Sequence, residues 1–331
     1  MQKFMRTVLP LLLTSCTSAA TLVPVTVHSG AALPGLSKLT TALSDSEATA
    51  ILLTLSDDKT TDAITTSSGS AVEEARAAAA AARRAVEASA LPVIAVADGR
   101  LSGECASIFF AAPYRLCTSK TVFSVDSCLQ GETPSLAALQ KMAEIGRTAP
   151  HIALATALGA LELRANDLIE LSLATHFAPR EALADLHNEL KASPSDYYDV
   201  PLSRRCSTLA PGWLVPLYAA EKAAPLYGAL FAAFGPDVGC LSQLIDRLDA
   251  QRKIATEHAT RLANEPCGIH IRTRERADAV RDALDAAGDA LSVSCPTALE
   301  ATFAAMRAAA EGQPLPAPVR RASSSSQRTS S

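Results

Sequence analysis

Apolar and polar positions along the chain fall into blocks that predict alternating strands and helices. Short apolar runs at residues 21–28, 50–55 and 93–97 have the length of buried strands. Helical spacing at residues 36–43 and an alanine-rich stretch at residues 73–90 predict the helices between them. This alternation favours an α/β fold with a parallel sheet that is buried on both faces.

The third apolar run begins the stretch around which the rest of the chain is organised. Asp98-Gly99 turns the chain, and Ser102-Gly103 then opens an apolar stretch of helical length at residues 105–112. Another short apolar run, at residues 121–125, predicts the strand that closes the unit. A strand, a turn, a helix and a strand in this order predict a crossover between parallel strands.

The remainder of the chain is predicted to be mainly helical. Residues 136–170 predict two helices divided at Pro150, and residues 180–190 predict another. The polar stretch at residues 191–211 holds three prolines and predicts a linker. Four further helices are predicted after it, at residues 213–234, 241–261, 274–287 and 296–311.

The two ends of the chain differ in composition from the rest. Residues 1–20 carry Lys3 and Arg6, a short apolar centre and no acidic residue, which fits a mitochondrial presequence. A secretory signal peptide fits as well, and the apolar run is too short to span a bilayer. Residues 313–331 are rich in Pro, Ser and Arg and predict a disordered tail, either solvated or in contact with RNA or phosphate.

These observations predict a leader at residues 1–20, a core at 21–190, a helical region at 191–312 and a tail at 313–331. The net charge of −4 argues against a surface that binds nucleic acid over its whole extent. The eight cysteines form no C-x-x-C pair, so neither a zinc site nor a disulfide framework is expected. The histidines at positions 151, 176, 187 and 258 are expected to satisfy core or surface hydrogen bonds.

Three segments carry a resemblance to a known family. Residues 91–112 resemble the pattern K-P-x-I-A-x-I-x-G-x-x-x-G-G-G and its following helix, from the enoyl-CoA hydratase/isomerase (crotonase) superfamily. Residues 158–177 and 294–299 are similar to segments of its 3-hydroxyisobutyryl-CoA hydrolase branch, including the motif A-T-H-F at residues 174–177. The resemblance spans roughly residues 21–312 and implies a crotonase-like (ClpP/crotonase) spiral of ββα units with a helical C-terminal region.

The resemblance also implies where a thioester oxyanion would bind. In the superfamily, two backbone N–H groups stabilise the oxyanion as its charge develops. The loop that supplies the first donor aligns with residues 65–69, which gives Thr66 that role. The second donor is the central glycine of the G-G-G turn, and this chain has Glu104 there, with added bulk and a negative charge.

Serines stand where the hydrolase branch has acids. The resemblance gives Ser127 the place of its catalytic glutamate and Ser135 that of an aspartate that contacts substrate. Asp126 and Glu132 are nearby carboxylates that could substitute. A one-residue slip in an extended segment turns a side chain to the other face, which weakens the case for Asp126. The later stretch at residues 234–239 resembles a lost family motif, but its position predicts a turn before a helix.

Three functions follow as hypotheses. The first is a protein of the hydrolase branch that has lost catalysis and acts as a structural or interaction protein in mitochondria, as the branch's relatives do in the mitochondrial ribosome of some lineages. The second is an active acyl-CoA thioester hydrolase of valine breakdown, and the third is a module that binds acyl-CoA without chemistry. Acyl-CoA would then be substrate or ligand, with no other cofactor and no metal.

Partners are expected on the C-terminal side. The hydrolase branch continues beyond the helix predicted at residues 296–311, so apolar core surface is expected to be exposed here. A different protein, a second copy of the chain, or ribosomal RNA and protein would cover it. No membrane span is expected.

Overall fold

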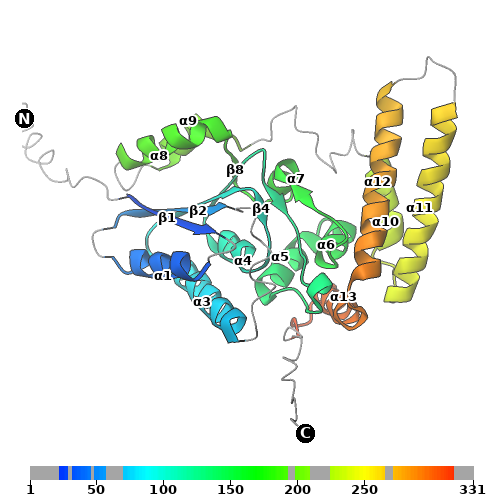
Figure 1. The fold of residues 1–331 in the computed structure, drawn as a ribbon, viewed down its shortest axis with the longest axis horizontal. Coiled ribbons are helices and arrows are strands. Elements are labelled where there is room, and N and C mark those ends of the chain that lie inside the picture. The colour runs from blue at the N-terminus through cyan, green and yellow to red at the C-terminus, as the bar shows by residue number, and fades with distance from the viewer. Residues whose placement is uncertain are drawn as a thin grey trace, which may run out of the picture.

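A computed structural model describes the parts of the chain that carry the fold, which form a central sheet with helices on both faces and a helical region beside it (Figure 1). The described residues are 22–28, 32–45, 48–56, 70–192, 198–208, 224–264 and 271–316. The predicted leader at residues 1–20 and most of the predicted tail lie outside them. The predicted boundary at residue 190 stays a prediction.

The described strands of the main sheet are parallel and occur in the order β1-β2-β3-β5-β8. The three predicted apolar runs form neighbouring strands in it, which confirms them. The strands are β1 (Leu22–His28), β2 (Ala50–Ser56), β3 (Val93–Asp98), β5 (Tyr114–Cys117) and β8 (His176–Phe177). The first five residues of β3 are buried, as a strand covered on both faces requires.

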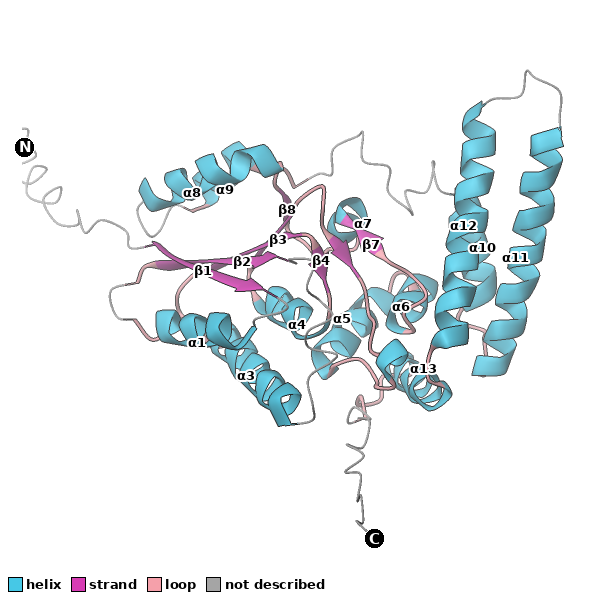
Figure 2. Cartoon of the chain, in the orientation of Figure 1, coloured by secondary structure: helices cyan, strands magenta, loops and turns pink. Residues whose placement is uncertain are grey.

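Two separate clusters of apolar side chains cover the two faces of this sheet. On one face, α1 (Ala32–Leu43), α3 (Ser70–Glu87) and α4 (Gly103–Ala111) pack over the larger cluster. On the other face, α8 (Leu183–Ala192) and α9 (Asp199–Arg205) bury the smaller one. Figure 2 shows these helices on opposite sides of the magenta strands.

The crossover through α4 closes on β5, so the prediction of a closing strand at residues 121–125 was wrong. Val122–Phe123 instead form β6 in a second sheet, ordered β4-β6-β7 with β4 (Arg100–Leu101) and β7 (Leu163–Arg164). Arg115 hides β5 in the sequence, because a cation is not expected in a strand inside the fold. Its guanidinium donates to the carbonyl oxygens of Ala112, Leu173 and Ser172 at 2.9, 2.7 and 3.2 Å.

The helices after the core also differ from the prediction in number. Residues 136–170 hold α5 (Leu136–Gly146), α6 (Pro150–Ala157) and α7 (Ala165–Glu170), because β7 interrupts the expected second helix. The predicted helix at residues 180–190 begins as a 3₁₀ turn, Arg180–Ala182, before α8.

The predicted linker at residues 191–211 contains a helix, α9. Pro201 lies in the first turn of α9, where a helix tolerates the missing N–H. Leu202 of α9 and Tyr198 just before it are buried against the sheet face covered by α8. Pro201 therefore marks a helix start, and the linker prediction is corrected for residues 199–205.

The four predicted C-terminal helices are confirmed within the described residues, and residues 213–223 of the first prediction lie outside them. The helices are α10 (Ala224–Phe234), α11 (Leu241–Asn264), α12 (Ile271–Val293) and α13 (Pro296–Ala310). Residues 235–240 form the predicted turn before α11, in which the Gly239 N–H donates to Gln243 Oε1 at 2.7 Å. α11 and α12 run antiparallel as a long hairpin beside the core (Figure 1). Within the described residues, no helix combines the length and apolarity needed to cross a membrane.

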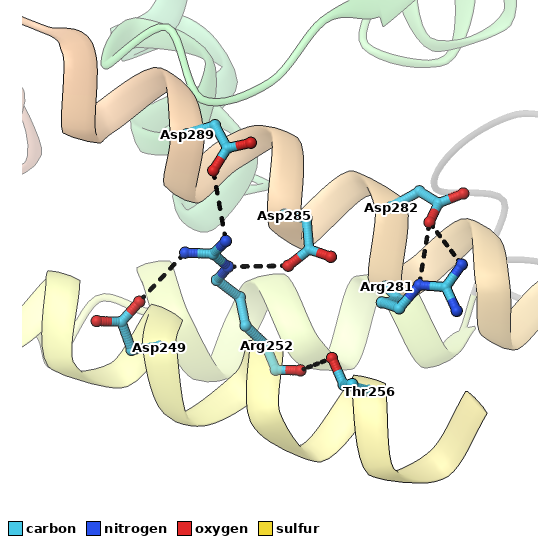
Figure 3. Close-up of polar contacts among 7 residues, drawn as sticks. All are labelled: Asp249, Arg252, Thr256, Arg281, Asp282, Asp285 and Asp289. Carbon is cyan, nitrogen blue, oxygen red and sulfur yellow. Dashed lines mark hydrogen bonds and ion pairs between the residues drawn. The ribbon is translucent and has the colours of Figure 1, made fainter. Parts of the chain in front are cut away.

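Arg252 connects the two helices of this hairpin. From α11, it lies 2.9 Å from Asp285 and 3.4 Å from Asp289 of α12, and 3.5 Å from Asp249 of its own helix (Figure 3). Gly288 makes room for it, because a Cβ there would lie 2.5 Å from an Arg252 nitrogen. Arg281, by contrast, pairs with Asp278 and Asp282 of its own helix, and no pair with α11 occurs among the described residues.

Gly159→Ala is expected to destabilise the protein more than Gly312→Ala. Both glycines have a left-handed φ, +79° and +75°, so alanine costs about 1–2 kcal/mol at either. Only at Gly159 would the new Cβ meet backbone, 2.7 Å from the Val125 oxygen, which adds about 1–3 kcal/mol. Urea unfolding measures both variants, and equal losses would contradict the close contact at Gly159.

Arg252→Gln is expected to lower the stability of the hairpin by about 1 kcal/mol, since its partners lie on two helices. Arg281→Gln is the matched control and should cost less than about 0.5 kcal/mol, because its pairs are local. Hydrogen exchange of α11 and α12 at low and high salt would measure both. The Arg252 effect should shrink at high salt, and a salt-independent effect would argue against ion pairing.

Candidate functional site

The candidate site lies around the first turn of α4, just beyond the carboxyl end of β3. Gly103 begins the helix with φ +52°, and Glu104 follows, half-buried in the first turn. The helix dipole favours a carboxylate at this end. The same end would stabilise an oxyanion, so Glu104 brings its own negative charge to that place. Thr66, the other predicted oxyanion donor, lies outside the described residues.

Asp126 is held in an ion pair with Arg100 of β4. The guanidinium Nη2 lies 3.2 and 3.4 Å from the two carboxylate oxygens, and the Ser124 hydroxyl donates to one of them at 3.3 Å. Arg100 also pairs with Glu162 at 2.8 Å. Burial lowers the pKa of Arg100, but its two carboxylate partners outweigh burial, and the net pKa is raised. Asp126 therefore faces a permanent cation.

Glu132 also forms an ion pair with an arginine, which comes from a different element. Its carboxylate lies 2.5 Å from the Arg76 guanidinium of α3, and both side chains are mostly buried. Glu132 and Asp126 thus have different arginine partners, on different elements. Neither partner was predicted, because each is distant in sequence and nothing in the local pattern marks it.

Ser127, at the family's glutamate position, begins a tight turn. Its carbonyl oxygen accepts the N–H groups of Gln130 and Glu132, each at 3.0 Å, and its hydroxyl caps no helix. Gly131 closes the turn with a left-handed φ of +79°. The described contacts of Ser127 are therefore those of a backbone turn.

Ser135, at the family's aspartate position, is the N-cap of α5. Its hydroxyl accepts the Ala138 N–H at 3.3 Å, and it lies 3.0 Å from the hydroxyl of Ser107 on α4. Ser107 in turn lies 3.3 Å from the carbonyl oxygen of Gly103. Ser135, Ser107 and Gly103 thus form a hydroxyl chain that joins the start of α5 to the start of α4. Sequence reasoning missed Ser107, which stands out only by its polarity in an apolar helix.

A polar cavity of about 570 Å³ begins at this hydroxyl chain and extends away from the first turn of α4. Ser107 and Phe110 of α4 line it, with Gln140 and Arg147 of the α5 region and Leu315 after α13. Glu104, Asp126, Ser127 and Glu132 do not. The candidate acids and the cavity are therefore separate features.

The described residues hold no group of three or more His, Cys, Asp or Glu side chains that could bind a metal. His176 is half-buried in β8, with Nδ1 2.9 Å from the Thr175 hydroxyl, and burial lowers its pKa. His151 is completely buried, yet neither ring nitrogen has a hydrogen-bond partner in the described chain. The expectation that it satisfies core hydrogen bonds was wrong, because aromatic rings surround it.

Two solved structures show the same fold. The chain is similar to a carnitinyl-CoA dehydratase from Mycobacterium thermoresistibile, with a TM-score of 0.61 and 16% identity, over 90% of this chain and 79% of that one. It is also similar to an enoyl-CoA hydratase from Rhodobacter sphaeroides 2.4.1, with a TM-score of 0.55 and 16% identity, over 87% and 76%. At this identity the likeness concerns the fold alone.

Sequence comparison gives the family. Among curated proteins no sequence matches the chain. The enoyl-CoA hydratase/isomerase family, however, matches residues 60–328, which include every candidate site residue. The chain therefore belongs to the enoyl-CoA hydratase/isomerase family and has a crotonase-like α/β fold with a helical C-terminal region.

Proposed function

We propose that this protein is a member of the 3-hydroxyisobutyryl-CoA hydrolase branch that has lost catalysis and serves as a structural or interaction protein. The observation that carries the proposal is the pairing of both candidate carboxylates with arginine, Asp126 with Arg100 and Glu132 with Arg76. General acid–base catalysis needs a carboxylate within hydrogen-bond reach of the substrate. Before it could act on a substrate, either carboxylate would have to separate from its arginine.

Glu104 adds an electrostatic argument. A carboxylate about 4 Å from a developing oxyanion raises its energy by about 4 kcal/mol at an effective dielectric constant near 20. One oxyanion-hole donor contributes about 3–4 kcal/mol to catalysis. A Glu104 carboxylate that came this close to the oxyanion would cancel the benefit of the backbone N–H at the same position.

An interaction role is supported by the C-terminal helices. Large apolar side chains are exposed on α10, α11 and α12, among them Phe231 at 46%, Ile254 at 57% and Val293 at 70%. Such side chains favour a protein partner or a second copy of the chain. The basic leader at residues 1–20 fits a mitochondrial presequence, and the family resemblance favours mitochondria over secretion. The arginine-bearing tail is compatible with the RNA and protein contacts of a mitochondrial ribosome subunit.

The full chain is expected to show no turnover of 3-hydroxyisobutyryl-CoA or of crotonyl-CoA above the uncatalysed rate. Release of the CoA thiol and loss of the enoyl absorbance measure the two reactions. Asp126→Asn and Glu132→Gln should leave that background unchanged. Hydrolysis that either substitution abolishes would establish the alternative, an active acyl-CoA thioester hydrolase.

Binding is measured separately from chemistry. Isothermal titration of the same protein with a non-hydrolysable acyl-CoA thioether should give no saturable heat. Saturable binding without turnover would replace the structural role with that of an acyl-CoA-binding module.

Ser135→Ala is expected to lower the free energy of unfolding by about 1 kcal/mol, because α5 loses its N-cap. Ser135→Asp is the control, since aspartate also caps helices and restores the family's acid. The free energy of unfolding of Ser135→Asp should stay within about 0.5 kcal/mol of that of the unaltered chain. The variant should still show no turnover. Thioester hydrolysis gained by Ser135→Asp alone would mean that the rest of the site is intact.

A further inference from the structure

The contact between α6 and α10 contains an ionisable group in a place that suits only its neutral form. His151 of α6 is 0% exposed, and no described protein group accepts from or donates to either ring nitrogen. Its ring lies edge-on to Tyr227 and Phe231 of α10, with centroid distances of 4.3 and 5.3 Å. Neutral imidazole packs in this setting as an aromatic ring, whereas imidazolium would lose its hydration without a replacement.

On the described helices that pack against α6, no charged group compensates for the burial of His151. The titratable side chains on the helices packed against α6 are Tyr227 of α10, Lys141 and Glu144 of α5, and Glu300 and Arg307 of α13. Lys141 and Glu144 pair with each other at 2.7 Å, and Arg307 donates to the carbonyl oxygens of Val238 and Gly239. Burial alone lowers the pKa of His151, and none of these groups contributes.

α10 is held by apolar contacts and is open to water along one side. Leu226, Leu230 and Phe234 are buried, while Tyr227 and Phe231, the two rings against His151, are 37% and 46% exposed. α10 also packs against α11 and α12, and so connects the hairpin to α6 and the core. Separation of α10 from α6 would therefore free one attachment of the hairpin.

We propose that His151 makes the α6–α10 contact an acid-sensitive latch, which opens when the imidazole takes up a proton and needs water. In the open form the pKa of His151 is near its ordinary value of about 6.5, and in the closed form it is lower. The closed form is therefore most stable above pH 6.5. It loses stability as the pH falls from 6.5 toward the pKa that His151 has in the closed form.

Hydrogen exchange of the full chain at pH 7.5 and 5.5, corrected for intrinsic rates, tests the latch. Protection of the α10 amides should fall between the two pH values, by at most about tenfold, because one proton is taken up on opening. His151→Phe keeps an aromatic ring and removes the proton site, so its α10 protection should be the same at both pH values.

His258→Phe is the matched control, because His258 is exposed on α11. In this variant the protection of the α10 amides should fall between the two pH values as it does in the unaltered chain. Equal protection of α10 at both pH values in the unaltered chain would overturn the proposal, and so would an undiminished fall in His151→Phe. If that variant does not fold, histidine NMR of the unaltered chain decides. A His151 pKa clearly below 6.5 supports the latch, and one at or above 6.5 refutes it.

Discussion

The main-chain hydrogen bonds of β2, β3 and β5 lie between two layers of apolar side chains, where water cannot replace them. Ile51, Ala95 and Cys117 face one layer, and Leu52, Ile94 and Leu116 face the other. Unpaired backbone groups in such a place are costly, so the three strands must stay in register. That register sets where β3 ends and α4 begins, and with it the place of Gly103 and Glu104.

The sequence pattern predicted the elements whose residues are as apolar as their buried environment in the fold. β2 and β3 are apolar on both faces, and both were predicted. β5 was missed, because Arg115 makes it look polar until the carbonyl oxygens of Ser172 and Leu173 are in place. α9 was missed for a similar reason, since proline in the first turn of a helix resembles proline in a loop.

The candidate site residues come from the family motifs and stay a prediction, whereas their contacts could not be predicted from the sequence. Alignment with the family motifs gave Glu104, Ser127 and Ser135, and the structure brings Ser135 close to the start of α4 through Ser107. The pairing of Asp126 and Glu132 with arginines was not predictable. Arg76 is 56 residues away from Glu132 in the sequence, and Arg100 is 26 from Asp126, so only the fold brings them together.

The hairpin of α11 and α12 has a geometric consequence. At about 1.5 Å per residue, the 24 residues of α11 extend about 36 Å. Arg252 bridges the two helices midway along that length, so the hairpin resists splaying there. A pair of helices of this length, tied together at its middle, holds a neighbour bound near its free end at a fixed distance from the sheet.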